Sequence, residues 1–173
     1  YSRAHSPTIQ FVSIRTIFGV SAATGAKLRG GDFGQAYLNA DNEKLIYSYP
    51  PKSARQHDDK GRRLVWAIPK ALYGGKASGR QWYKLLRTKL IEHGFTASEW
   101  DPCVFTRKCE DGSLYIIGVY VDDLVHSYHN DAEYEKTVAW IREEFNKYVK
   151  YEDLGPLSEI FNAEVTQTPG LLI

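Results

Sequence analysis

The sequence predicts a single α+β domain built on an antiparallel sheet with helices on one face. Three observations support this. The 173 residues, 43% of them hydrophobic, suffice for one core. Short apolar runs alternate with helical patterns, and two of these runs, residues 114–119 and 124–128, meet at a tight turn. Apart from an inserted hairpin, the order strand, helix, strand, strand, helix, strand is the split βαβ (ferredoxin-like) plan.

The first elements expected are a packing helix and a strand. Ser6 and Pro7 offer an N-cap and a first-turn proline, and apolar residues follow at helical spacing until Gly25. Residues 26–32 then have the pattern of a strand, which ends at Asp32. The helix is expected to pack on the domain and the strand to enter the sheet.

A hairpin is expected to be inserted after this strand. Its strands are residues 46–49 and 64–68, and the polar run RQHDDKGRR joins them. Asp58 and Asp59 lie in that run. Because Asp favours turns for purely local reasons, we expect a solvated loop without chemistry there.

The second half is expected to supply two further helices and the rest of the sheet. One helix runs from about Ser78 to His93 and closes at Gly94. The other begins at a cap formed by Asn130 and Glu133 and carries apolar residues on one face. The expected strands are 104–106, 114–119, 124–128 and 158–166, with a tight turn at Asp111-Gly112.

The most informative pattern is the acidic pair Asp122-Asp123 between two strands rich in Val, Ile and Tyr. Neighbouring carboxylates repel each other unless cations bind between them, and Mg²⁺ prefers such hard oxygen ligands. In the split βαβ plan the first strand lies beside the third, so Asp32 is expected near this pair. Three carboxylates at one sheet edge suit two-metal catalysis of phosphoryl transfer.

Basic residues are concentrated in one stretch, although the net charge is only +1. No acidic residue occurs between Lys60 and Ile91, where Lys and Arg alternate with Trp and Tyr. Such a stretch is typical of a surface that follows nucleic-acid phosphates. A solvated basic helix face explains the charge equally well.

Composition excludes several other classes. No apolar run approaches the roughly 18 residues that span a bilayer, and a signal-peptide pattern is lacking, so we expect a soluble intracellular domain. Cys103 and Cys109 have no His partners at zinc spacing and are too few for a disulfide framework, which predicts free thiols. The ends of the sequence are typical of a piece of a longer polypeptide.

The chain resembles the reverse transcriptase domain of Ty1/copia-type long-terminal-repeat retrotransposons from about His5 to Val165. The motifs, in family order, are HSPTIQFVSIRT, GGDFGQAYLNA, IYSYPP, LYGGKASGRQWY, DPCVF, YVDD and DLGPLSEIF. The resemblance implies a polymerase palm with part of the fingers. It also implies RNA- and DNA-templated DNA synthesis with two Mg²⁺ ions, for which Mn²⁺ can substitute.

The same resemblance implies partners and a location. The partners are an RNA or DNA template with its primer, dNTPs, and the thumb, ribonuclease H and integrase domains of a polyprotein. No membrane is implied, an oligomer is possible, and the location is cytoplasmic, within virus-like particles. Residues 1–173 would form one palm and partial fingers domain.

Site residues follow from the matched motifs. The metal site comprises the carboxylates of Asp32, Asp122 and Asp123 and the carbonyl of Phe33. The residues implied to lie beside the nucleotide are Gln35 and Ala36 through their amides, Tyr37 as the gate against a ribose 2′-hydroxyl, Gly74 and Lys76. The residues implied to lie beside primer and template are Tyr120, Val121 and Arg80. The alternatives are a core tyrosine at Tyr37, strand packing at Tyr120 and Val121, and exposed helix cations at Lys76 and Arg80.

The sequence also departs from the family pattern. Gly75-Lys76-Ala77 stands where Leu-Lys-Gln is usual, so the glutamine expected near the nucleotide is missing, and Ile160 to Asn162 replace FLG. The upstream fingers strand is expected before Tyr1, and the primer-gripping hairpin, thumb and ribonuclease H after Ile173. Activity of the isolated chain is therefore an open question.

Two other functions compete with a polymerase. A palm remnant would bind nucleic acid or protein without adding nucleotides. A GGDEF-type nucleotide cyclase is the other, because LRGGDF at Leu28 to Phe33 is similar to its signature loop. The order of motifs is unfavourable for a cyclase, since no Asp precedes Asp32 and YVDD would have no role.

Overall fold

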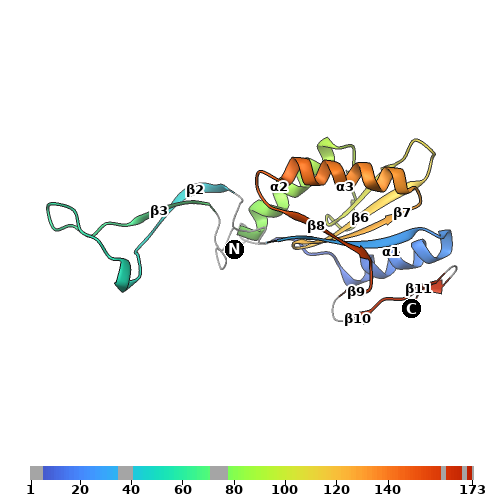
Figure 1. Ribbon diagram of the computed structural model, residues 1–173, viewed down its shortest axis with the longest axis horizontal. Helices are drawn as coiled ribbons and strands as arrows, with labels where there is room; N and C mark the ends of the chain where they lie inside the picture. The colour runs from blue at the N-terminus through green and yellow to red at the C-terminus, as the bar shows by residue number, and fades with distance from the viewer. Residues whose placement is uncertain (1–5, 35–40, 71–77, 161–162, 169–170, 173) are drawn as a thin grey trace.

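A six-stranded antiparallel sheet forms the centre of the molecule (Figure 1). The structure is a computed structural model that describes residues 6–34, 41–70, 78–160, 163–168 and 171–172. The strand order is β4-β5-β6-β7-β1-β8, so the early strand β1 lies between two late ones. The strands are β1 Lys27–Phe33, β4 Thr96–Ala97, β5 Val104–Lys108, β6 Leu114–Tyr120, β7 Asp123–Tyr128 and β8 Tyr151–Pro156.

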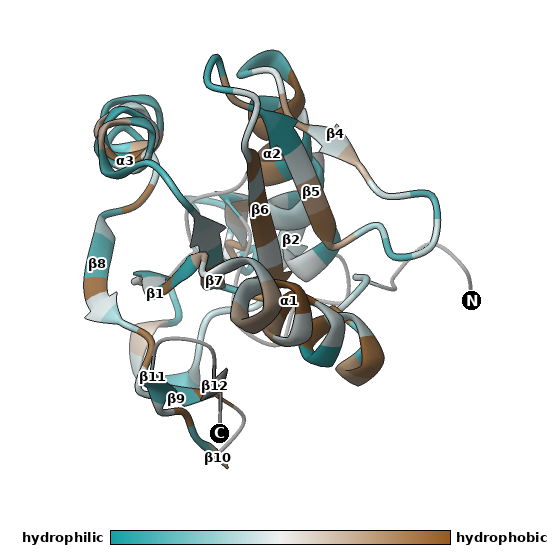
Figure 2. Cartoon of the chain, turned by 90° about the vertical axis from the view of Figure 1, so that its right-hand side faces the viewer, coloured by the Kyte–Doolittle hydropathy of each residue, from teal (hydrophilic) through white to brown (hydrophobic). Residues whose placement is uncertain are grey.

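Helices cover both faces of the sheet. The helices are α1 Phe11–Thr24, α2 Ser78–Glu92 and α3 Asp131–Phe145. Figure 2 shows α2 and α3 on one face and α1 on the other. The α+β class and the antiparallel sheet are thus confirmed, whereas the expectation of helices on one face fails for α1.

Gly118 explains how α1 reaches the second face. A Cβ atom at this position would lie 2.9 Å from Cδ1 of Ile9 and 3.1 Å from Cδ1 of Ile17. The missing side chain on β6 therefore leaves the space that the isoleucines of this segment fill. Ser21 adds a buried hydrogen bond of 2.7 Å to Ser127 on β7.

The main core lies between the sheet and the pair α2 and α3. Phe33, which is fully buried, contacts Trp82 of α2, Phe145 of α3 and Tyr151 of β8, with ring centroids 4.9, 5.0 and 5.0 Å away. Each such aromatic pair contributes about 0.5–1.5 kcal/mol beyond simple burial. The residue that follows Asp32 is therefore held from three sides.

The helix ends agree with the sequence in most places. Gly25 closes α1 at φ 74°, and the Asn130 side chain accepts hydrogen bonds from the amides of Ala132 and Glu133 at the start of α3. However, α1 begins at Phe11 and not beside Ser6, whose hydroxyl donates to the Gly79 carbonyl at 3.1 Å. A capping role for Ser6 is therefore wrong.

The prediction fails at the last strand of the sheet. That strand is β8, Tyr151–Pro156, and the predicted segment 158–166 instead contributes β9 Glu159–Ile160 and β10 Ala163–Glu164, which pair outside the sheet. A further pair, β11 Gln167–Thr168 and β12 Leu171–Leu172, was not expected either. An edge strand carries charged residues on its open side, so YEDLGP lacks the apolar run of a central strand.

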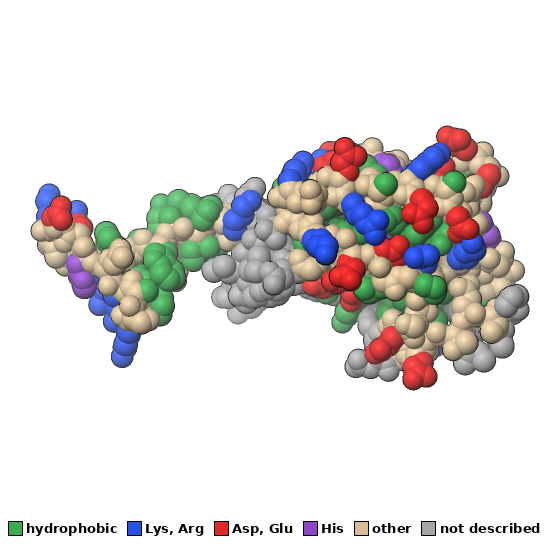
Figure 3. All heavy atoms as spheres, viewed as in Figure 1, with side chains coloured by type: hydrophobic (Ala, Val, Ile, Leu, Met, Phe, Trp, Pro, Cys, Tyr) green, Lys and Arg blue, Asp and Glu red, His purple; other side chains and the backbone are tan. Residues whose placement is uncertain are grey.

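The inserted hairpin forms an arm, β2 Asp41–Ser48 and β3 Trp66–Lys70, that projects from the sheet (Figure 1). Residues 64–65 were expected in the strand but precede it. Hydrophobic side chains line much of the arm in Figure 3. Exposed large hydrophobic residues of the arm are Leu45, Ile46, Tyr47, Tyr49, Leu64, Val65 and Trp66.

Two further features concern the described residues as a whole. Cys103 and Cys109 are both free thiols, as predicted, and both are buried. Among the helices within the described ranges, none is long and apolar enough to cross a membrane.

Candidate metal centre

The sheet brings the predicted carboxylates together. Asp32, near the end of β1, lies directly opposite Asp123, the first residue of β7. Asp122 precedes Asp123 in the turn that joins β6 to β7. Side chains alternate along a strand, so Asp32 and Asp123 share the sheet face that points away from the α2 and α3 core.

The turn itself is strained. Val121 has φ 61°, a left-handed conformation that a β-branched residue rarely adopts and that costs about 1–3 kcal/mol. The Nε1–H of Trp82 donates to the Val121 carbonyl at 3.0 Å, and the amide of Phe33 donates to the Asp122 carbonyl at 3.0 Å. Two groups from distant parts of the chain thus fix the turn that carries the acidic pair.

The carboxylates disfavour one another's charge. Burial, followed by the charges of Asp122 and Asp32, raises the pKa of Asp123 to about 6. Burial, followed by Asp122 and Glu152, raises the pKa of Asp32, and burial raises that of Asp122. Asp123 is solvent-accessible, so the packed strands weaken its hydration without removing it. Within the described part of the chain, no Lys or Arg forms an ion pair with these three residues.

The donor chemistry fits a divalent cation. Carboxylate oxygens that repel each other and remain accessible are the ligands that Mg²⁺ prefers. As they stand, however, no three Asp, Glu, His or Cys side chains among the described residues form a ready group that could hold a metal ion. The three carboxylates of Asp32, Asp122 and Asp123 are therefore neighbours, but their side chains would have to move closer together to bind one cation.

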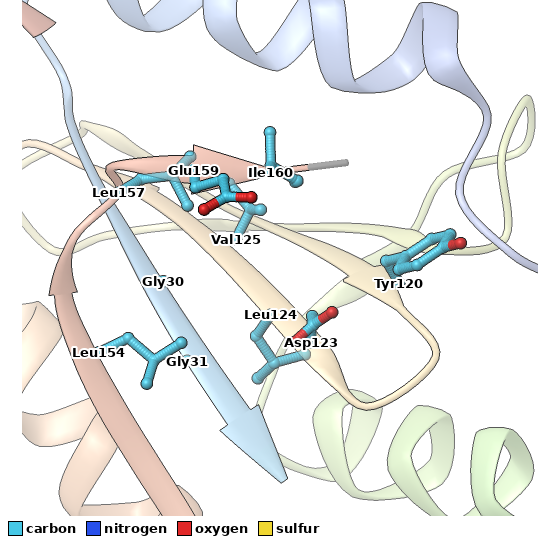
Figure 4. A pocket seen from close by; sticks show the side chains of 10 residues that line it. All are labelled: Gly30, Gly31, Tyr120, Asp123, Leu124, Val125, Leu154, Leu157, Glu159 and Ile160. Atoms are coloured by element: carbon cyan, nitrogen blue, oxygen red, sulfur yellow. The ribbon is translucent and has the colours of Figure 1, made fainter. Parts of the chain in front are cut away.

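A hollow of about 460 Å³ adjoins Asp123 (Figure 4). Gly30 leaves its floor open, because a Cβ atom there would already touch Leu157 at 3.4 Å. Tyr120, which pairs with Asp123 across the hairpin, stands at its other side. The residues around it include Tyr120, Asp123, Leu154, Leu157, Glu159 and Ile160.

The other predicted site residues divide into two groups. Gln35, Ala36, Tyr37, Gly74 and Lys76 lie outside the described residues. Phe33 is buried beside Asp32, Val121 lies in the strained turn, Tyr120 is exposed at the hollow, and Arg80 is partly exposed on α2.

Trp82 is the contributor that sequence reasoning missed. Its place among the aromatic residues of the basic stretch suggested a surface role, whereas it is almost completely buried and supports the turn. Nothing in the sequence indicates that the Val121 carbonyl is its hydrogen-bond partner.

Comparisons with known proteins identify the family of the chain. A sequence profile of the family described as reverse transcriptase (RNA-dependent DNA polymerase) matches residues 1–172. The retrovirus-related Pol polyprotein from transposon TNT 1-94 of Nicotiana tabacum is 26% identical over 96% of the chain and 12% of its own length. The corresponding polyprotein from transposon RE1 of Arabidopsis thaliana is 35% identical over 72% of the chain and 8% of its own length.

A yeast relative extends the range of hosts. The transposon Ty1-MR1 Gag-Pol polyprotein of Saccharomyces cerevisiae is 29% identical over 72% of the chain and 7% of its own length. The chain thus spans 12% or less of the length of each of these three relatives. No solved structure gives a significant match.

Proposed function

The chain belongs to the reverse transcriptase family of Ty1/copia-type retrotransposon Pol polyproteins, and we propose that it forms the metal-binding part of an RNA-directed DNA polymerase. The observation that supports this proposal most directly is that Asp32 lies opposite Asp123, which follows Asp122 in the chain. In this proposal β1, α2, β6, β7, α3 and β8 form a polymerase palm of the split βαβ type. The β2–β3 arm is part of the fingers, and residues 1–173 act as one domain.

The carboxylates of Asp32, Asp122 and Asp123 would hold two Mg²⁺ ions, together with the carbonyl of Phe33. When bound, the ions would activate a primer 3′-hydroxyl and neutralise the departing pyrophosphate. The raised pKa of Asp123 supports this role, because bound cations would offset the burial and the neighbouring carboxylate charges that now oppose its ionisation. The hydrogen bonds to the turn would keep the acidic pair in place during the reaction.

The hollow beside Asp123 supports a place for the primer end. Tyr120 borders it from the hairpin, next to Val121 in the chain, and its floor at Gly30 is bare backbone. A base or sugar could therefore lie flat against the sheet with its 3′-hydroxyl near the carboxylates. Arg80 on α2 would contact a primer or template phosphate.

The incoming dNTP would lie beside segments outside the described residues. We assign its triphosphate to the amides of Gln35 and Ala36 and to Lys76, with Gly74 allowing close approach. Tyr37 would exclude a ribose 2′-hydroxyl. These roles rest on the family resemblance alone.

The arm would contact the template strand. Tyr49 and Trp66 are 66% and 51% exposed, as base-stacking side chains require, and the Arg63 guanidinium lies 5.4 Å from the Tyr49 ring centroid. Solvent-exposed cations on the same loop would approach phosphates. This contact would weaken steeply with salt.

A remnant that binds nucleic acid without polymerising is the second candidate. One observation favours it: the described residues contain no ready-made metal group. The cyclase alternative has lost its support, because the reverse transcriptase profile covers the chain from residue 1 to residue 172, including the LRGGDF segment.

Primer extension separates the two candidates. The chain, and a version extended by fingers and thumb segments of the Ty1/copia family, are incubated with poly(rA)·oligo(dT), dTTP and Mg²⁺ or Mn²⁺. Asp122→Asn should lower extension by more than about a hundredfold, since even the outer partners of metal ligands have effects that large. Asp131→Asn, a matched change at an exposed carboxylate at the start of α3, should leave it unchanged.

The extended version decides the outcome. If it folds and binds the template-primer but adds no nucleotide with either metal, the polymerase proposal fails and the remnant takes its place. Extension that survives Asp122→Asn would equally remove the metal centre from the mechanism.

A further inference from the structure

A buried chain of hydrogen bonds crosses the sheet behind the acidic residues. The hydroxyl of Tyr115 on β6 lies 3.0 Å from Nδ1 of His126 on β7, and Nε2 of His126 lies 2.8 Å from the hydroxyl of Tyr151 on β8. All three side chains are at most 4% exposed. They occupy the face toward α2 and α3, opposite the face that carries Asp32 and Asp123.

The histidine in this chain is neutral. Complete burial lowers the pKa of His126 to about 3. A neutral imidazole donates from one ring nitrogen and accepts at the other, so each tyrosine hydroxyl meets a nitrogen of defined role. Water cannot replace either partner in so buried a position, which makes both bonds costly to lose.

The bond between His126 and Tyr151 spans β1, because β1 lies between β7 and β8. It crosses at Gly31, the residue before Asp32. A Cβ atom at Gly31 would overlap the Tyr151 hydroxyl and lie 2.5 Å from Cζ of that ring. Glycine at this position is therefore what allows the link to exist.

The ladder between β1 and β8 is irregular at the same place, although the ladder between β1 and β7 continues. The pairing of β1 with β8 shifts register between Gly30 and Gly31, which pair with Gly155 and Asp153 and leave Leu154 between them. Two adjacent glycines add conformational freedom just before Asp32. The side-chain link thus supplies a constraint where the strand ladder is interrupted.

We propose that the hydrogen bond between His126 and Tyr151 positions Asp32 against Asp123 for metal binding. These are positioning residues, because they lie behind the sheet and touch neither metal nor substrate. The inference rests on the proposed function, since it presupposes that the carboxylates bind cations. It explains how Asp32 and Asp123 can bind a cation together although the described residues contain no preformed metal-binding group.

Mn²⁺ binding, followed by electron paramagnetic resonance of the free ion, tests the link without requiring polymerase activity. Tyr151→Phe removes only the hydroxyl and should weaken Mn²⁺ binding about tenfold, the low end for a lost hydrogen bond that supports a metal site. Tyr115→Phe is the matched control. It breaks a bond to the same histidine that does not cross β1, and should weaken binding no more than about twofold.

Hydrogen exchange gives a second readout. Tyr151→Phe should speed exchange of the amides around Gly31 and Asp32, while Tyr115→Phe should not. Equal effects of the two variants on Mn²⁺ affinity, or no effect of Tyr151→Phe, would overturn the inference. If Tyr151→Phe fails to fold, Gly31→Ala combined with Tyr151→Leu replaces it, because the leucine vacates the space that a Cβ needs.

The Asp122→Asn variant separates the two levels of the argument. If it leaves Mn²⁺ affinity unchanged, the metal centre itself is wrong and the positioning inference falls with it. If Asp122→Asn abolishes binding while Tyr151→Phe binds like the wild type, only the positioning inference fails.

Discussion

The dipeptide Asp-Asp occurs twice in this chain, in two opposite environments. Asp58 and Asp59 lie in the loop of the arm, and Asp122 and Asp123 lie at the hairpin turn of the sheet. In the arm, Asp58 accepts hydrogen bonds from the amides of Lys60 and Arg62 and forms an ion pair with the Arg62 side chain at 2.7 Å. At the hairpin, by contrast, the charges that act on Asp123 are those of two other carboxylates, Asp122 and Asp32.

The pKa values of Asp58 and Asp123 shift in opposite directions. Hydrogen bonds from the Arg62 amide and side chain lower the pKa of Asp58, whereas burial and the neighbouring acids raise that of Asp123 to about 6. A carboxylate that already has its own donors gains little from a metal ion. The difference teaches that the fold around an acidic pair, and not the pair itself, creates a potential cation site.

Removing Trp82 should have the largest effect, because the hairpin turn depends on the distant core. Trp82→Ala is expected to lower the free energy of unfolding by about 3–5 kcal/mol, as for other buried aromatic residues. Trp82→Phe keeps a ring but leaves the Val121 carbonyl without its hydrogen-bond donor. This change should lower the free energy of unfolding by about 1–3 kcal/mol. Urea denaturation measures both changes.

The matched control is Trp100→Ala, at a tryptophan that is 91% exposed. It should change the free energy of unfolding by less than about 0.5 kcal/mol. If Trp82→Phe is as stable as the wild type, the hydrogen bond to the turn does not support the hairpin.

Val121→Gly should act in the opposite direction. At φ 61° glycine avoids the strain of a β-branched residue, so the free energy of unfolding should rise by about 1 kcal/mol. The control is Val65→Gly in the arm, a position without positive φ, where glycine should lower stability by about 0.5–1 kcal/mol. Thermal unfolding of both variants distinguishes them, and destabilisation by Val121→Gly would show that the turn carries no strain.

Much of this contrast is visible in the sequence. The apolar runs on either side of Asp122 predict the hairpin, and the order of elements predicts that Asp32 lies beside it; β1 and β7 do pair at these residues. The polar run around Asp58 likewise predicts a solvated loop, and the Asp58 side chain there is satisfied locally. The hydrophobic periodicity and the composition of a segment suffice to predict its structure where one face of the element is buried.

Other features could not be predicted from patterns. Positive φ at Val121 contradicts the preference of a β-branched residue and exists only because tertiary contacts hold it. The charged residues of β8 break the apolar pattern by which a strand is predicted, although an edge position in the sheet tolerates them. The site for α1 depends on the missing side chain of Gly118, which in sequence is merely a glycine in a strand. Each is a tertiary effect that overrides a local preference.

The smallest effects should come from neutralising one acid of each pair in metal-free buffer. Between the ordinary pKa near 4 and about 6, the folded chain binds a proton at Asp123 that the unfolded chain lacks, so stability falls as pH rises through this window. Asp123→Asn should therefore raise the urea midpoint at pH 7.5, and the gain should vanish near pH 4.

Asp58→Asn should do the reverse. A lowered pKa contributes stability above the ordinary value near 4 that is lost as pH falls through the folded value. This variant should therefore be slightly less stable than the wild type at pH 7.5, and the difference should shrink as the pH falls below about 4. Urea midpoints that shift in the same direction for both variants would contradict the comparison. Adding Mg²⁺ tests the same comparison, because a cation that binds the folded state should raise the urea midpoint of the wild type. The Mg²⁺-induced rise should be the same for Asp58→Asn and smaller for Asp123→Asn.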